Sequence, residues 1–219
     1  MFRHSELVIG TSDGIPIKYM AEKVISCPCT HKMMAESKNP WKLLGSKEIY
    51  KDKRVRIRAD NVIRPNKEKG VYVVVESSPG VIIAAVNENK EVALVRQWRY
   101  PQGKEYWELP AGHCDKEEDF LHAAKRELEE EAGILAKKWT DIGPVEQKVD
   151  RANDNVRLFL AQGLAIGRFI PDPAEAKERR FVPIREAVEM ANDGRLSAAS
   201  ALAGIYRAAC RLGVLKLQK

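Results

Sequence analysis

GHCDKEEDFLHAAKRELEEEAGI, residues 112–134, is the stretch that decides how this 219-residue chain is interpreted. Two of its apolar residues, Leu128 and Ile134, stand at fixed distances from seven further residues. These seven are Gly112, Glu118, Arg126, Glu127, Glu130, Glu131 and Gly133. Seven specified letters, each at a typical frequency of about 6%, match at a random start only about once in 10⁸ to 10⁹ positions. The spacing is therefore a strong signal before any chemistry is considered.

Residues from about Glu117 to Ala132 are expected to form an α-helix, because they include many strong helix formers and neither Pro nor Gly. Asp115 is the expected N-cap, and Gly133 fits the C-terminal stop. The apolar face of this helix is expected to comprise Phe120, Leu121, Ala124 and Leu128. A different face of the helix is strongly acidic.

Three carboxylates meet on the acidic face, since Glu127, Glu130 and Glu131 are spaced i, i+3 and i+4. Like charges at this spacing destabilise a helix by roughly a few tenths of a kcal/mol, and a bound divalent cation would relieve the repulsion. Oxygen ligands of this kind suit Mg²⁺ or Mn²⁺. The plain alternative is a solvated acidic helix face, and the register with Gly112 and Arg126 weighs against it.

The full pattern resembles the Nudix box, G-x5-E-x7-R-E-U-x-E-E-x-G-U with U apolar, and every position of the box is filled. The resemblance implies an α/β fold, the Nudix α/β/α sandwich with a mixed sheet. It also implies a metal-dependent hydrolase that splits a pyrophosphate bond in a nucleoside diphosphate linked to another group. Four box residues are expected to be structural: Gly112, Glu118, Arg126 and Gly133. Arg126 has carboxylates on either side, so a bidentate ion pair is its natural role.

The residues before the box extend the resemblance. VRQWRYP (residues 95–101) and WELPAG (residues 107–112) resemble the RQYR(Y)P and (W)ELPAG stretches of ADP-ribose pyrophosphatases and related nucleoside diphosphate sugar hydrolases. This resemblance covers about residues 41–212. It implies hydrolysis of ADP-ribose or a related nucleoside diphosphate sugar to a nucleoside monophosphate and a sugar phosphate. The alternatives are another substrate (GDP-mannose, ADP-glucose, a dinucleoside polyphosphate or an RNA cap) or a non-catalytic module that senses a nucleotide.

The same resemblance implies the ligands of the metal, Mg²⁺ or in its place Mn²⁺. They are the Ala111 carbonyl, Glu127 and Glu131, with Glu130 in a supporting role, and Glu130 and Glu131 are also candidates for catalysis. Glu175 falls where the family places a loop glutamate that binds metal or acts as the base. The position two residues earlier, often acidic, is Pro173, so the general base stays unassigned among the nearby carboxylates.

Two further residues are expected to bind substrate. Arg99 would contact the phosphates or the terminal ribose, because its charged fork of donors suits phosphate better than Lys does. Its alternative is a surface arginine at the end of a strand. Glu108 would bind polar groups of the substrate, or would instead be a structural carboxylate that faces a backbone amide. ADP-ribose hydrolases often carry a Pro about 15 residues beyond the box, and here the nearest is Pro144, so the substrate is less certain than the chemistry.

The chain is expected to divide into three parts. Residues 1–40 form an extension of unknown role, and Met33 or Met34 is the expected natural start. Residues 41–78 form a small antiparallel β region that, by resemblance, pairs with a second subunit in a homodimer. Residues 79–219 form the Nudix hydrolase domain. The expected strands are residues 43–50, 55–62, 71–76, 81–86, 91–98, 107–109, 156–164 and 181–184, with the fourth and fifth forming a hairpin. The expected later helices are residues 185–192 and 197–212.

Composition sets limits on partners and setting. The net charge of +6 favours anionic partners, including nucleotides, and does not single out nucleic acid. No apolar run approaches the roughly 20 residues that a membrane span needs. Four scattered cysteines do not suggest a disulfide framework, so a cytoplasmic setting is expected.

Overall fold

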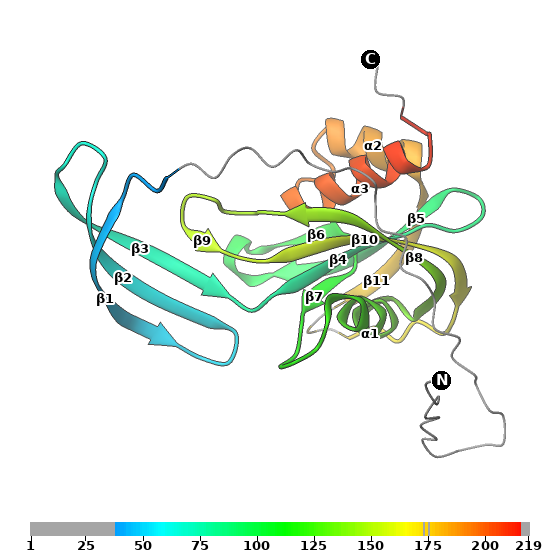
Figure 1. Cartoon of the computed structure of the whole chain (residues 1–219). Coiled ribbons are helices and arrows are strands. Elements are labelled where there is room, and N and C mark those ends of the chain that lie inside the picture. The colour runs from blue at the N-terminus through cyan, green and yellow to red at the C-terminus, as the bar shows by residue number, and fades with distance from the viewer. Residues whose placement is uncertain (1–37, 173, 175, 216–219) are drawn as a thin grey trace, which may run out of the picture.

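The computed structural model describes residues 38–172, 174 and 176–215, which form three sheets and three α-helices (Figure 1). The helices are α1 (Phe120–Ala132), α2 (Ile184–Asn192) and α3 (Ala199–Arg211). Met33, Met34 and almost all of the expected N-terminal extension lie outside the described residues, as does Glu175.

The first sheet is built by the N-terminal β region and stands at one side of the molecule (Figure 1). Its antiparallel strands are β1 (Lys42–Lys51), β2 (Val55–Ile63) and β3 (Lys69–Ser77). A short fourth strand, β9 (Ala152–Asn153), pairs in parallel with β3. Because β9 belongs to the connection between β8 and β10, it ties the first sheet to the rest of the chain.

The other two sheets form the middle of the molecule. The second sheet is mixed, since β4 and β10 are parallel, while β7 pairs antiparallel with β4 and β8 pairs antiparallel with β10. Its strands, in order across the sheet, are β7 (Ala111–His113), β4 (Gly80–Ala85), β10 (Val156–Ile166) and β8 (Ile134–Val145). The third sheet is antiparallel, in the order β11 (Ala176–Pro183), β5 (Glu91–Arg99) and β6 (Lys104–Glu108), and the 3₁₀ turn η1 (Tyr100–Gln102) joins β5 to β6.

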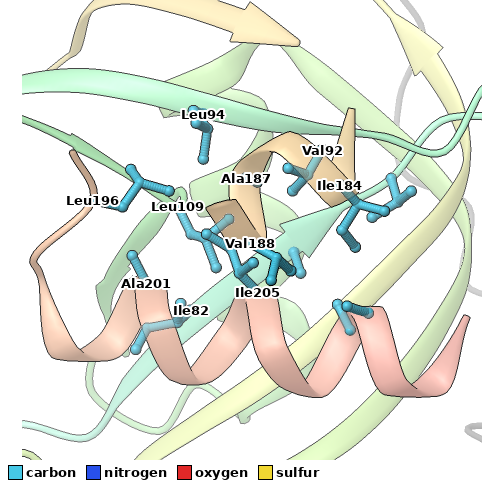
Figure 2. Packing of buried hydrophobic residues seen from close by; sticks show 14 of the residues in the cluster. Ile82, Val92, Leu94, Leu109, Ile184, Ala187, Val188, Leu196, Ala201 and Ile205 are labelled. Atoms are coloured by element: carbon cyan, nitrogen blue, oxygen red, sulfur yellow. The ribbon is translucent and has the colours of Figure 1, made fainter. Parts of the chain in front are cut away.

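Alternating side chains of the central strands divide the core into two layers. On β5, Val92 and Leu94 pack on the side of α2 and α3, whereas Ala93 and Val95 pack on the side of α1. Figure 2 shows the first of these layers, in which side chains of α2 and α3 interleave with those of the strands. Strands buried on both faces are typical of sheets covered by helices on two sides. The fold is the expected α/β/α sandwich.

The expected hairpin of residues 81–86 and 91–98 is wrong. β4 and β5 belong to different sheets, and a single bridge between Val86 and Val92 joins them within the described chain. Both strands are apolar on both faces, so each lies inside a sheet: β4 lies between β7 and β10, and β5 lies between β11 and β6, the strand that follows it directly. Short-range turn signals could not reveal those partners.

Two element boundaries also differ from expectation. The helix begins at Phe120 rather than near Glu117, and Asp119 is its N-cap instead of Asp115. Glu117 has a φ of 67°, which interrupts the helical backbone just before the cap. The long strand β8 was not expected, because its exposed lysines and its Gly-Pro pair obscure the alternation of apolar residues. Strand β11 begins five residues earlier than expected, at Ala176.

Candidate active site

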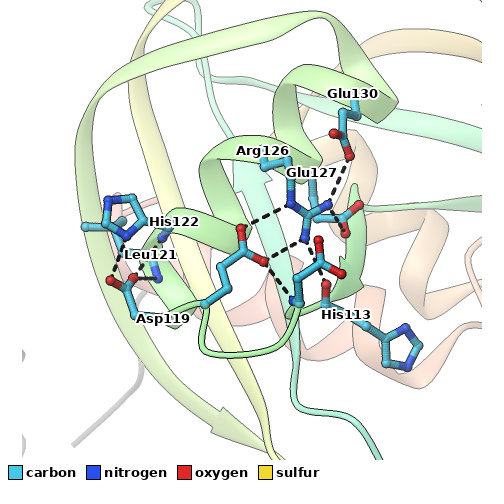
Figure 3. A network of polar contacts seen from close by, with 9 residues as sticks. His113, Asp119, Leu121, His122, Arg126, Glu127 and Glu130 are labelled. Carbon is cyan, nitrogen blue, oxygen red and sulfur yellow. Dashed lines mark hydrogen bonds and ion pairs between the residues drawn. The ribbon is translucent and has the colours of Figure 1, made fainter. Parts of the chain in front are cut away.

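Arg126 is the centre of a polar network that joins α1 to the loop before it (Figure 3). Its Nε and Nη2 atoms donate to the two carboxylate oxygens of Glu118 at 3.1 and 2.9 Å. Nη2 also donates to the carbonyl oxygen of His113 at 2.9 Å, and Glu118 accepts the backbone N–H of Asp115 at 2.9 Å. The guanidinium of Arg126 lowers the pKa of Glu118, which keeps this carboxyl charged. The network therefore closes the loop between β7 and α1.

The same guanidinium also contacts two carboxylates of the acidic face. Nη1 of Arg126 donates to Glu127 at 2.8 Å and to Glu130 at 3.0 Å (Figure 3). Glu127 is largely buried, while the side chain of Glu130 is more than half exposed. Arg126 thus reduces the mutual repulsion of the cluster that the spacing predicted.

Gly112 leaves room for Glu127. A Cβ atom at position 112 would lie 2.0 Å from the carboxyl carbon of Glu127, far inside van der Waals contact. The strand β7 can therefore approach the acidic face of α1 only because residue 112 has no side chain. This packing explains in physical terms why a glycine precedes the helix at this spacing.

Glu131 is the most deeply buried carboxylate of the cluster, with 7% of its surface exposed. One oxygen accepts the side-chain amide of Gln97 at 2.7 Å, and the other accepts the backbone N–H of Ala111 at 2.8 Å. Burial, with a smaller contribution from the charge of Glu127, raises the pKa of Glu131 to about 7 against the opposing effect of these hydrogen bonds and of the charge of Arg99. A cation beside Glu131 would stabilise its charged form.

Arg99 and Glu108, the two expected substrate-binding residues, form an ion pair on the third sheet. Nε of Arg99 donates to Glu108 at 2.8 Å, and Nη2 contacts the same oxygen. Glu108 is largely buried and Arg99 is partly exposed. The charge of Arg99 also acts on Glu131, so this arginine lies within electrostatic range of that carboxylate.

The oxygen donors of this cluster suit a hard divalent cation, but its described side chains alone do not complete a metal site. In the described part of the chain, no three His, Cys, Asp or Glu side chains form a group that could hold a metal ion. Glu127 and Glu131 are close enough for their charges to interact, and the main chain of Ala111 lies against Glu131. The chemistry of this donor set fits Mg²⁺ or Mn²⁺, which bind through one or two carboxylates and complete their shell with water and phosphate. Glu175, expected as a further ligand, lies outside the described residues.

Gln97 is a site residue that the sequence reasoning missed. It is 3% exposed and lies 34 residues before the carboxylate that it binds. Val95 and Gln97 alternate onto the α1 face of β5, where the other inward positions are apolar. A polar residue at an inward position of a buried strand is a signal that could have identified it.

A separate recess opens on the N-terminal sheet. It has a volume of about 370 Å³ and contains none of the expected site residues; its lining comprises Asn39, Trp41, Leu43, Arg58, Asp60, Val62 and Tyr72. Arg58 forms ion pairs there with Asp60 at 3.0 Å and, through Nε, with Glu76 at 3.2 Å. The recess is distinct from the carboxylate cluster of α1.

Comparisons with known proteins point to one family. The family model for the NUDIX domain matches residues 76–203. An ADP-ribose pyrophosphatase of Mycobacterium tuberculosis is 31% identical over 175 residues, which cover 78% of this chain and 84% of that protein. An ADP-ribose pyrophosphatase of Bacillus subtilis is 30% identical over 145 residues, covering 66% and 77%.

A solved structure supports the fold independently. A crystal structure described as an ADP compounds hydrolase superposes with a TM-score of 0.71 at 17% identity, covering 82% of this chain and 98% of that one. At this identity the likeness shows the fold. In the described residues, no helix is long and apolar enough to cross a membrane. The chain carries the complete box around α1, the domain model matches more than half of the chain, and a relative aligns along most of both sequences. The chain therefore belongs to the Nudix family of hydrolases.

Proposed function

We propose that this Nudix enzyme hydrolyses the pyrophosphate bond of ADP-ribose or a related nucleoside diphosphate sugar, releasing a nucleoside monophosphate and a sugar phosphate. The observation that carries the proposal is the position of Glu131. This box carboxylate is buried, both of its oxygens accept hydrogen bonds, and the charge of Arg99 acts on it. The two relatives described as ADP-ribose pyrophosphatases support the substrate class.

Mg²⁺, with Mn²⁺ as the alternative, is the proposed cofactor. Glu127, Glu131 and the main chain of Ala111 would hold it, Glu130 would support them, and Glu175 would complete the set. When bound, the ion neutralises diphosphate charge, polarises phosphorus and lowers the pKa of an attacking water.

The chain's own residues supply orientation and charge. Gln97 and the Ala111 amide hold Glu131 in one orientation. Glu108 holds the guanidinium of Arg99, which would bind the substrate's phosphates or terminal ribose. Among Glu130, Glu131 and Glu175, the residue that accepts a proton from water is to be assigned by single substitutions.

The test is a substrate panel assayed for release of nucleoside monophosphate with and without Mg²⁺. ADP-ribose, ADP-glucose, GDP-mannose, a dinucleoside polyphosphate and capped RNA cover the alternatives. We expect the highest kcat/KM with ADP-ribose or another nucleoside diphosphate sugar. Preferred cleavage of capped RNA or a dinucleoside polyphosphate would contradict the substrate class. Binding of ADP-ribose without any Mg²⁺-dependent turnover would favour a nucleotide-sensing module.

We also propose that the N-terminal sheet forms a homodimer interface. Leu43, Ile49 and Val71 are each more than half exposed on β1 and β3, and Leu44 and Tyr50 are exposed beside them. Exposed apolar side chains gathered in one small sheet are typical of a surface that another chain covers. A reducing, cytoplasmic setting is proposed as well, supported by the free thiols of Cys114 and Cys210.

A further inference from the structure

The C-terminal turn of α1 is electrostatically unfavourable as it stands in the sequence. It carries Glu129, Glu130 and Glu131 at the negative end of the helix dipole and has no basic residue of its own. Cations normally occupy the last turn of a helix, and acidic groups there destabilise it. The turn that bears two of the proposed catalytic carboxylates therefore needs a stabilising contact from elsewhere in the fold.

Arg179 of β11 supplies that contact. Its Nη1 atom donates to the carbonyl oxygen of Ala132 and lies 3.4 Å from that of Gly133, and both Nη atoms lie 3.5 Å from that of Gly167. The guanidinium also lies over two aromatic rings, 5.5 Å from the centroid of Phe169 and 5.9 Å from that of Phe181. A strand residue 47 positions away from Ala132 thus takes the role of the missing C-terminal cation.

The helix end and the segment after β10 pack closely around this arginine. Gly133 has a φ of 60°, and a Cβ atom there would lie 2.6 Å from the carbonyl oxygen of Arg168. The N–H of Gly167 donates to the carbonyl oxygen of Gly133 at 2.9 Å. Arg179 binds carbonyls of both segments, so one guanidinium joins the end of α1 to the segment that leads toward β11.

The register of the third sheet links Arg179 to Gln97. Arg179 stands opposite Val95 on β5, and Gln97 is the next residue of β5 on the same face. One sheet face therefore holds the last turn of α1 at two points. Gln97 binds the side chain of Glu131, and Arg179 binds the backbone carbonyls that follow it.

We propose that Arg179 is a positioning residue of the Nudix site, which holds the C-terminal turn of α1 so that Glu130 and Glu131 stay in place for the metal and substrate. The metal part of this inference rests on the proposed function, whereas the effect on the helix end does not. A lysine would not substitute. A point charge cannot reach carbonyls of two segments while stacking on two rings, as a planar fork can.

The experiment compares Arg179→Met and Arg179→Lys with Arg180→Met, a matched control at the next position. Arg180 is exposed and lies 5.8 Å from the ring of Trp107 rather than at the helix end. Mn²⁺ affinity is measured directly on the metal-free proteins by electron paramagnetic resonance. Amide hydrogen exchange of residues 129–134 is measured in the same metal-free samples.

Positioning by Arg179 predicts about tenfold weaker Mn²⁺ binding in both Arg179 variants, the usual scale for residues that orient metal ligands. It also predicts faster exchange of the last-turn amides in both variants and wild-type behaviour of Arg180→Met. Tighter Mn²⁺ binding in Arg179→Met would show that only charge matters and would overturn the proposal. Wild-type affinity or exchange in Arg179→Lys would overturn it as well.

The proposed metal-dependent function and the proposed role of Arg179 can fail separately. If the wild-type protein binds no Mn²⁺, the proposed metal-dependent function fails. Faster exchange at residues 129–134 in both Arg179 variants would then still support Arg179 as the residue that holds the helix end, and unchanged exchange would overturn it.

Discussion

At the scale of single residues, the site is defined by the donors that bind each carboxylate of one helix. Arg126 binds Glu127 and Glu130, while Gln97 and the Ala111 amide bind Glu131. Neutral donors do not offset the burial of Glu131, so its pKa stays high. This imbalance makes Glu131 the carboxylate that gains most from a bound cation.

The raised pKa of Glu131 predicts a pH-dependent stability of the metal-free protein. Its folded-state pKa of about 7 exceeds the usual 4.5, so its contribution is full below pH 4.5 and is lost as pH rises through 7. That loss amounts to about 3 kcal/mol at 1.36 kcal/mol per unit. Denaturant unfolding of the protein in the presence of a metal chelator, repeated across this pH range, measures the predicted loss of stability. Glu131→Gln should remove this part of the slope, and identical profiles for the two proteins would refute the assignment.

Gly112 gives a second prediction at this scale. In Gly112→Ala, the new Cβ would occupy the place of the Glu127 carboxyl group, so Glu127 must move. We expect Mg²⁺-dependent turnover to fall by about 10- to 100-fold, as when a metal ligand loses its support. Gly45→Ala is the matched control, because a Cβ there meets nothing within 4 Å. Equal activities in the two variants would contradict the packing argument.

At the scale of elements, the box helix was predictable and its start was not. The spacing of Leu128, Glu127 and Glu131 follows from helical periodicity, which is local. The start depends on Glu118, whose carboxylate is occupied by Arg126 and by the N–H of Asp115. The helix therefore begins after Glu118, with Asp119 accepting the N–H groups of Leu121 and His122.

This boundary is testable by comparing two aspartates. Asp119→Ala removes the N-cap and should lower the free energy of unfolding by about 1 kcal/mol, the typical value of such a cap. Asp115→Ala should cost clearly less, since the hydrogen bond of residue 115 to Glu118 comes from its backbone. Urea denaturation of both variants measures the difference. A larger loss in Asp115→Ala would restore the cap expected from the sequence.

Strand partners were the least predictable part of the fold. β4 pairs with β10, whose partner residues lie 76 positions later in the sequence, and the buried amide of Gln97 binds a carboxylate on another element. Such contacts depend on which apolar faces pack together, and the apolar patterns of β4 and β5 alone are equally compatible with a hairpin. Residues 112–134 specified the carboxylate cluster and Arg126, whereas the residues that hold Glu131 and the end of α1 came from β5, β7 and β11.

At the scale of the whole molecule, the proposed dimer is a property of the N-terminal sheet. By strand register, Leu43 and Val71 stand on opposite faces of this sheet. Leu43→Glu combined with Val71→Glu should therefore place a charge on each face and convert a dimer into a monomer, measured as molar mass by sedimentation. Leu135→Glu is the control, because Leu135 is also half exposed but lies on β8. A monomeric wild-type protein, or a dimer that survives both substitutions, would refute the interface.

The central claim is that the buried carboxylate of the box performs metal-dependent pyrophosphate hydrolysis. The most direct test is the turnover of ADP-ribose by Glu131→Gln at saturating Mg²⁺. Glu129→Gln, from the same helical turn, is the matched control. Glu129 is exposed and stands at an unspecified position of the box. We predict a fall in kcat of about 100-fold or more for Glu131→Gln, with both variants folded and Glu129→Gln close to wild type. Near wild-type turnover in Glu131→Gln would contradict the claim.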